Sequence, residues 1–191
     1  MKSNIFKTVT LILVASSLFT ACKKDEKELP EPVEQEVITT AKFHVTGADG
    51  FDKTFVYKVE NGFNNGTPGS INIDDIVLAP GKEYNATITL LNEKENPAED
   101  ITTEVQSENS EHLFIYESNP ATGAGSITFK SGDKDAEGNP FNQVIVFSTG
   151  DAGNGTLTIT LKHQPTNKNA TTADAAGGET DVEAIFPVKL Q

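Results

Sequence analysis

The stretch that decides the fold class is Val37-Ile38-Thr39-Thr40-Ala41-Lys42-Phe43-His44-Val45-Thr46, in which side chains of different character alternate. Successive side chains of a β-strand point to opposite faces of the sheet. Val37, Thr39, Ala41, Phe43 and Val45 would therefore line one face, and the intervening residues the other. This period of two predicts a strand that is buried on one face.

The same pattern returns along the rest of the chain, separated by turns rich in Gly, Asn, Asp and Pro. Further strands are expected at 54–59, 71–78, 84–91, 112–116, 127–129, 144–149, 156–163 and 181–190. The segment from Leu78 to Tyr84 looks like the strand-turn-strand corner of immunoglobulin-like sandwiches. We therefore predict an all-β fold: an immunoglobulin-like antiparallel β-sandwich of about eight to nine strands with one short helix.

Two strands carry more detailed expectations. The run 144–149 is almost continuously apolar, which is typical of a strand buried on both faces. In the strand 156–163, Leu157, Ile159 and Leu161 are expected to point inward, and Thr158, Thr160 and Lys162 outward.

The predicted helix covers residues 97–109, where Pro97 follows a possible Asn96 cap. The segment 164–178 is rich in Asn, Thr, Ala and Gly, which favours a long flexible loop. Pro187 cannot donate a ladder hydrogen bond, so the last strand should lie at an edge or contain a bulge.

Composition limits the possible functions. The 191 residues carry a formal charge of −13 and include no arginine. This charge argues against nucleic-acid binding, which needs a basic surface. The simplest explanation of the negative charge is that it keeps the protein soluble. The alternative is that it attracts a cationic binding partner.

The N-terminal segment indicates export. Lys2 and Lys7 give it a positive start, and the apolar run from Val9 to Phe19 is too short to span a bilayer. Small residues precede Cys22, the only cysteine of the chain. This pattern resembles a bacterial lipobox, although Phe19 stands where Leu is usual. The resemblance implies that residues 1–21 are a lipoprotein signal peptide and that Cys22 is lipidated on its sulfur and α-amine. An ordinary cleaved leader with an incidental cysteine is the alternative.

Residues 22–36 are charged and contain two prolines, so we expect an extended tether that joins the lipid anchor to a β-sandwich domain over 37–191. The beginning of this tether is similar to the charged segment after the acylated cysteine of Bacteroidetes lipoproteins. That similarity implies an outer-membrane location, lipid-anchored and exposed at the cell surface.

One loop has the start of a calcium-binding pattern. Asp133, Asp135 and Glu137 stand at alternate positions and Gly138 follows, as in the loops that hold Ca²⁺ through oxygen ligands. The pattern then ends, because Val144 stands where a bidentate Glu is needed. A turn between two strands is the simpler interpretation of the same residues.

No catalytic, metal or cofactor residues are assigned. His44, His112 and His163 have no second ligand at metal spacing in the sequence, so exposed histidines are expected. The chain also lacks a Gly-x-Ser-x-Gly elbow.

The aromatic residues divide into two groups. Phe43, Phe55, Phe129 and Phe186 fall on apolar faces of predicted strands and are assigned to the core. Phe51, Phe63 and Phe141 lie in predicted loops and are the candidates for an exposed contact, unless they fold back onto the domain.

Three segments together resemble a family of small Bacteroidetes lipoproteins of unassigned function: Leu90–Thr102, Asp133–Pro140, and Gly177–Glu183 with Phe186–Val188. The resemblance supplies no catalytic residues. We expect a non-enzymatic, lipid-anchored envelope protein that binds an unknown protein or glycan partner, or assists a larger complex, through its loops. A small envelope hydrolase and a purely structural surface protein are the alternatives.

Overall fold

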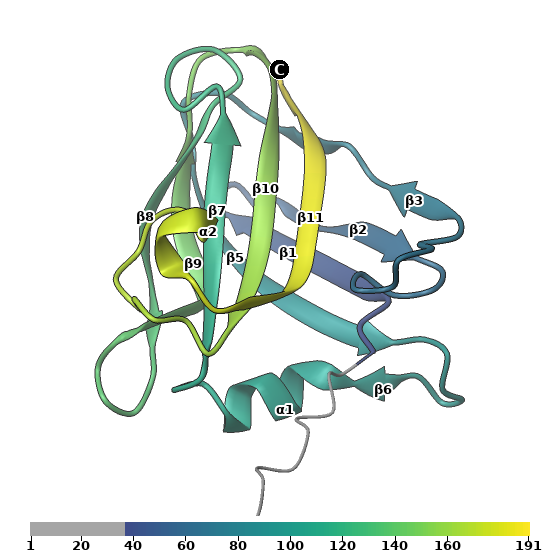
Figure 1. The fold of residues 1–191 in the computed structure, drawn as a ribbon. Helices are drawn as coiled ribbons and strands as arrows, with labels where there is room; N and C mark the ends of the chain where they lie inside the picture. The colour runs from purple at the N-terminus through teal and green to yellow at the C-terminus, as the bar shows by residue number, and fades with distance from the viewer. Residues whose placement is uncertain (1–36) are drawn as a thin grey trace, which may run out of the picture. The chain divides into compact units, whose positions relative to one another are not determined.

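The computed structural model describes residues 37–191, which form a two-layered β-sandwich (Figure 1). The predicted all-β sandwich is confirmed, whereas its immunoglobulin-like character stays a prediction. The described part contains eleven strands and two helices, more than expected. The signal peptide, Cys22 and the tether lie outside the described residues.

One layer is a seven-stranded sheet with the order β3-β2-β1-β5-β9-β8, and β6 pairs with β5. Its strands are β1 (Thr40–Gly47), β2 (Asp52–Val59), β3 (Ile71–Ile73), β5 (Glu83–Asn92), β6 (Glu99–Asp100), β8 (Ile127–Lys134) and β9 (Pro140–Thr149). All of its pairs are antiparallel.

The other layer is a four-stranded sheet with the order β4-β11-β10-β7. Its strands are β4 (Ile76–Leu78), β7 (His112–Asn119), β10 (Gly153–His163) and β11 (Glu179–Leu190). The pair β4–β11 is parallel, so the sandwich is not wholly antiparallel as predicted. β11 lies between β4 and β10 and is not an edge strand, but it contains a β-bulge, the other predicted alternative. Pro187 needs no partner on the β4 side, because β4 pairs only with Val188–Leu190.

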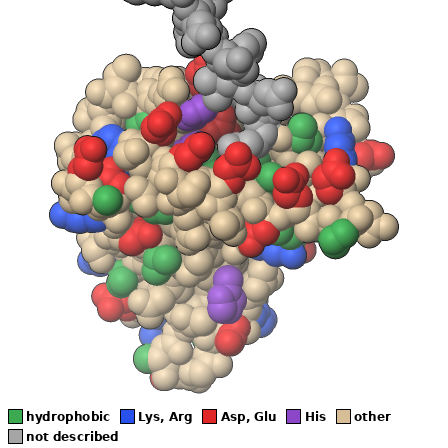
Figure 2. Space-filling model, turned by 90° about the horizontal axis from the view of Figure 1, so that it is seen from below, with side chains coloured by type: hydrophobic (Ala, Val, Ile, Leu, Met, Phe, Trp, Pro, Cys, Tyr) green, Lys and Arg blue, Asp and Glu red, His purple; other side chains and the backbone are tan. Residues whose placement is uncertain are grey.

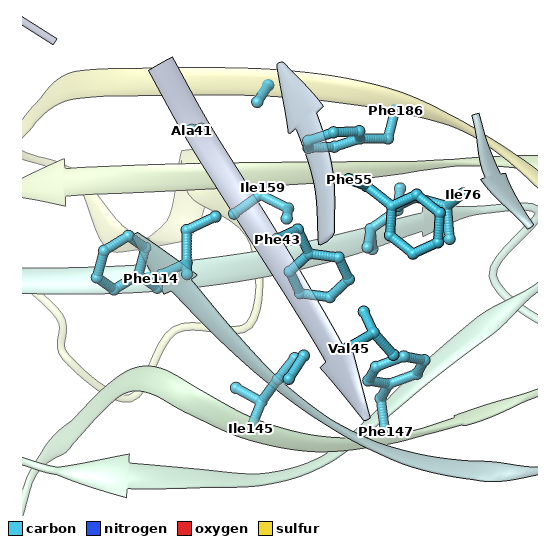
Figure 3. Packing of buried hydrophobic residues seen from close by; sticks show 14 of the residues in the cluster. Ala41, Phe43, Val45, Phe55, Ile76, Phe114, Ile145, Phe147, Ile159 and Phe186 are labelled. Carbon is cyan, nitrogen blue, oxygen red and sulfur yellow. The ribbon is translucent and has the colours of Figure 1, made fainter. Parts of the chain in front are cut away.

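The core lies between the two sheets and follows the predicted alternation. Ala41, Phe43 and Val45 of β1 are fully buried, as is Phe186 of β11. The Phe43 ring lies 6.0 Å from that of Phe147 and 6.4 Å from that of Phe186, so it joins both layers (Figure 3). Aromatic rings at such distances contribute packing energy beyond the area that they bury.

Residues 71–78 are two strands in different sheets rather than the one predicted. The chain crosses between the layers at Asp74 and Asp75, so Ile71 and Ile73 stay exposed while Ile76 and Leu78 are buried. The predicted corner follows: Pro80-Gly81 returns the chain to the first sheet, and the backbone N–H of Ala79 donates to Tyr84 Oη at 3.1 Å.

The helix α1 (Ile101–Ser107) begins later than predicted. Glu99 and Asp100 pair with β5, and the Asp100 carboxylate accepts a hydrogen bond from the Thr102 N–H as its cap. Ile101 and Val105 then bury one face of the helix against the core.

Two expectations about burial were wrong. The strand β9 is covered on one face only, because Val144 is 45% exposed while Ile145 and Phe147 are buried. The segment 164–178 contains a second helix, α2 (Ala173–Ala176), and packs on the outer face of the four-stranded sheet (Figure 1). Thr160 and Lys162, expected outside, are consequently buried on that face.

Candidate functional site

The candidate ligand site is a groove between β7, β8 and the segment 164–178, which we call the β7–β8 groove. Two adjoining hollows of about 230 and 250 Å³ share Phe129, Asn142, Ala170 and Thr171 as lining. The groove therefore lies where the edge strands of the two sheets face each other. A concave site with apolar walls and a few polar groups is the usual form of a ligand site in proteins.

Phe129 forms the apolar platform of this groove, although the sequence assigned it to the core. Phe129 pairs with Phe147 of β9, so both side chains lie on the face of the sheet that is turned toward the core. Phe147 is fully buried, whereas Phe129 is 39% exposed. The reason is that β8 is the edge strand of its sheet, and the Tyr116 ring packs beside Phe129 there. The two rings are nearly parallel, 5° apart in orientation with centroids at 6.1 Å.

Asn142 ties the two sheets together beside this platform. Its Nδ2 donates to the Phe114 carbonyl at 3.1 Å, and its own carbonyl accepts from Tyr116 Oη at 2.9 Å. Its φ of 62° is left-handed, which Asn tolerates better than most residues. Gly132 leaves room for this side chain, since a Cβ there would lie 2.3 Å from Asn142 Oδ1.

Tyr116 contributes a fixed hydroxyl to this arrangement. Burial raises the pKa of Tyr116, and the nearby charge of Asp133 raises it further. The phenol therefore stays protonated and keeps donating to Asn142.

Lys168 holds the third wall of the groove. Its Nζ donates to the carbonyls of Asn109 and His112, both at 2.6 Å, and lies 3.1 Å from Asp135 Oδ2. One ammonium thus connects the segment 164–178 to the start of β7 and to the β8–β9 turn. Ala170 and Thr171, which line the groove, follow two and three residues later.

The aromatic candidates predicted from the loops all fold back onto the domain. Phe51 packs edge-on against Tyr84, and Phe63 packs against Tyr57. Phe141 is 3% exposed and contacts the Phe114 ring. The exposed aromatic platform is therefore Phe129. The alternation of β8 predicts the face of the sheet on which Phe129 lies, but it does not predict whether another part of the chain packs over that face.

The calcium-like loop forms a hydrogen-bonded turn. Asp135 Oδ1 accepts from the N–H groups of Glu137 and Asn139, while its Oδ2 contacts Lys168. Asp133 Oδ1 accepts from the Val144 N–H at 3.0 Å. Both aspartates thus have partners within the chain, which favours the interpretation as a turn.

The histidines differ in exposure: the His44 side chain is 44% exposed, that of His163 is 14% exposed, and His112 is buried. His44 lies 2.8 Å from Asp52 Oδ1. His112 and His163 are cross-strand neighbours whose rings stack at 4.8 Å, and His112 is 1% exposed, so the expectation of exposed histidines was wrong for these two. Burial lowers the pKa of His112, although the hydrogen bond with Glu108 and the charge of Asp181 oppose this shift.

Another hollow, with a volume of about 320 Å³, is lined by Val37, Ile38, Lys94 and the loop 61–66. It contains no exposed aromatic platform, because Phe63 turns its ring toward Tyr57.

Among the described residues, no helix is long and apolar enough to cross a membrane.

The chain was compared with protein-family models, curated proteins and solved structures, and none of the three comparisons found a match.

Proposed function

We propose that this protein is a non-enzymatic, lipid-anchored binding module of the bacterial outer membrane, and that its ligand site is the β7–β8 groove. The observation that carries this proposal is the partly exposed Phe129 ring, which lines the groove together with the nearly parallel Tyr116 ring. An apolar ring that lines a hollow offers apolar area for a ligand to cover, and such burial contributes about 25 cal/mol per Å².

The lining of the groove favours a ligand with one apolar face and several hydroxyl groups. Phe129 offers the flat apolar surface, and Asn169, Thr171 and Lys134 add polar donors and acceptors to the lining. A carbohydrate ring has this combination of an aliphatic face and a polar edge. Each hollow is smaller than a typical ligand site of about 300–1,000 Å³, so we propose that it holds one or two rings of a longer glycan.

Loss of the platform should weaken glycan binding. The full chain with Cys22→Ser would be tested on an array of neutral oligosaccharides, alone and with Phe129→Ala. We expect about a tenfold loss of affinity, which corresponds to about 1.4 kcal/mol for one aromatic contact. The matched control is Ile71→Ala, an exposed apolar residue of β3 at the opposite edge of the sheet. Equal affinities of the two variants, or no oligosaccharide bound by the parent, would contradict the proposal.

The anchor is supported by the position of the single cysteine after the apolar leader. Each buried methylene of an acyl chain contributes about 0.8 kcal/mol, so several chains hold a protein firmly on a membrane. The wild-type protein should therefore pellet with the membranes of its host, and the variant Cys22→Ser should stay in the supernatant. Retention of Cys22→Ser in the membrane fraction would refute lipidation at this residue.

A further inference from the structure

His112, His163 and Asp181 meet at one end of the four-stranded sheet, although they are far apart in the sequence. His112 begins β7 and pairs directly with His163 at the end of β10. Asp181 comes from β11 at a β-bulge: Leu161 pairs with Val182 and Lys162 with Thr180, which leaves Asp181 as the extra residue. Bulges often redirect a side chain at functional sites.

The three side chains offer one ligand atom each, and these atoms all lie within 4.8 Å of one another. The distance from His112 Nε2 to Asp181 Oδ2 is 3.8 Å. The side chains of His112 and Asp181 are 1% and 4% exposed, and that of His163 is 14% exposed. The cluster is therefore shielded on the protein side and open to solvent beside His163.

The hydrogen bonding of His112 suits a metal ligand. Its Nδ1 lies 3.1 Å from the Glu108 carbonyl, which can only accept, so Nδ1 carries the proton. This tautomer leaves the lone pair on Nε2, the nitrogen that faces Asp181. A ligating histidine commonly has this second contact to a backbone carbonyl.

Acidic side chains lie near the cluster, and Lys168, whose Nζ donates to the His112 carbonyl at 2.6 Å, is a basic neighbour. Glu111 Oε2 lies 3.9 Å from His163 Nε2, and Glu104 and Glu108 belong to the same end of the molecule. Figure 2 shows acidic side chains gathered on this face, seen from below. A surface rich in charges of one sign raises the local concentration of the opposite ion.

We propose that His112, His163 and Asp181 form a binding site for a divalent transition metal, with Zn²⁺ as the best match. Two imidazoles and one carboxylate are among the ligand sets that hold Zn²⁺ in proteins. Three protein ligands leave a fourth position for water or for the Glu111 carboxylate. This site is independent of the β7–β8 groove.

The geometry requires one local adjustment. The ligands of a tetrahedral Zn²⁺ lie about 3.3 Å apart. The two imidazoles are stacked 12° from parallel, so their lone pairs cannot yet converge on one ion. Rotation of the partly exposed His163 ring would bring its nitrogen toward the other two ligand atoms, and metal binding should therefore unstack the rings.

Zn²⁺ itself is the probe for this site. The full chain would carry Cys22→Ser, to remove the thiol as a competing ligand, and no polyhistidine tag. Titration calorimetry at pH 7.5 should show one equivalent bound, and Zn²⁺ should raise the thermal midpoint, because a ligand that binds only the folded state stabilises it. His163→Gln should weaken binding by at least about 100-fold, more than loss of an outer-shell partner would. His44→Gln is the matched control and should bind as the parent does.

A second measurement does not depend on the folding of any variant. In the parent chain, the ring signals of His112 and His163 should shift on addition of one equivalent of Zn²⁺, while those of His44 should not. The proposal is overturned if no saturable equivalent binds, if His163→Gln binds as tightly as His44→Gln, or if the His44 signals alone respond.

Discussion

At the level of single residues, the role of Asp135 in the structure differs from one of the roles that the sequence suggested. The sequence placed it in a calcium-like pattern, but its carboxylate closes the β8–β9 turn and contacts Lys168. Burial alone would raise the pKa of Asp135, yet the hydrogen bonds from Asn139 and Glu137 and the charge of Lys168 outweigh it and lower that pKa. The ionised form is therefore the one that the fold stabilises.

This lowered pKa predicts a loss of stability in acid. Because the pKa of Asp135 is lower in the folded than in the unfolded state, its contribution is present above the unfolded pKa of about 3.9. The contribution is lost as the pH falls through the folded pKa. Asp135→Asn should therefore flatten the decline of the free energy of unfolding between pH 5 and pH 3, measured by urea unfolding at each pH. Parallel profiles of the variant and the wild type would contradict this role.

At the scale of single elements, the alternation of apolar residues was a good guide to the strands and a poor guide to their surroundings. It correctly gave the buried faces of β1 and β5, because side-chain direction in a strand is local. It did not show that the chain would change sheets between Ile73 and Ile76. It also could not show that β8 would be an edge, which is why Phe129 was assigned to the core.

The segment 164–178 is the element that composition described least well. Its Asn, Thr, Ala and Gly residues favour flexibility, yet the segment is fixed by tertiary contacts of a few side chains. The N–H of Ala173 donates to Glu117 of β7, and Thr172 caps α2. Such long-range contacts leave no periodic signal in the sequence.

Lys168 is expected to be the main attachment of this segment. Lys168→Met would leave the Asp135 carboxylate and two carbonyls without their ammonium partner, and should lower the free energy of unfolding by about 3 kcal/mol. Amide protons of 164–178 should exchange faster in the variant. The control is Lys189→Met, which removes an ion pair with Asp75 whose side chains are nearly half exposed and should cost less than about 1 kcal/mol. Equal effects of the two substitutions would show that Lys168 is an ordinary surface lysine.

At the scale of the whole molecule, the candidate sites arise from the packing of the two sheets. The β7–β8 groove exists because the edge strands of both sheets face each other and the segment 164–178 forms the third wall. The histidine cluster exists because β7, β10 and β11 are neighbours in one sheet. The sequence contained every one of these residues, but their proximity depends on strand order and register, which spacing alone does not determine.

Binding of a glycan on the Phe129 platform of the β7–β8 groove is the function that we propose. It is tested most directly by nuclear magnetic resonance of the full chain with Cys22→Ser, titrated with the neutral oligosaccharide that binds best on the array. We expect the largest shifts on Phe129, Tyr116, Asn142 and Thr171, with saturation at one equivalent. Shifts centred on the hollow at residues 61–66 instead, or no saturable shift with any oligosaccharide of the array, would contradict it.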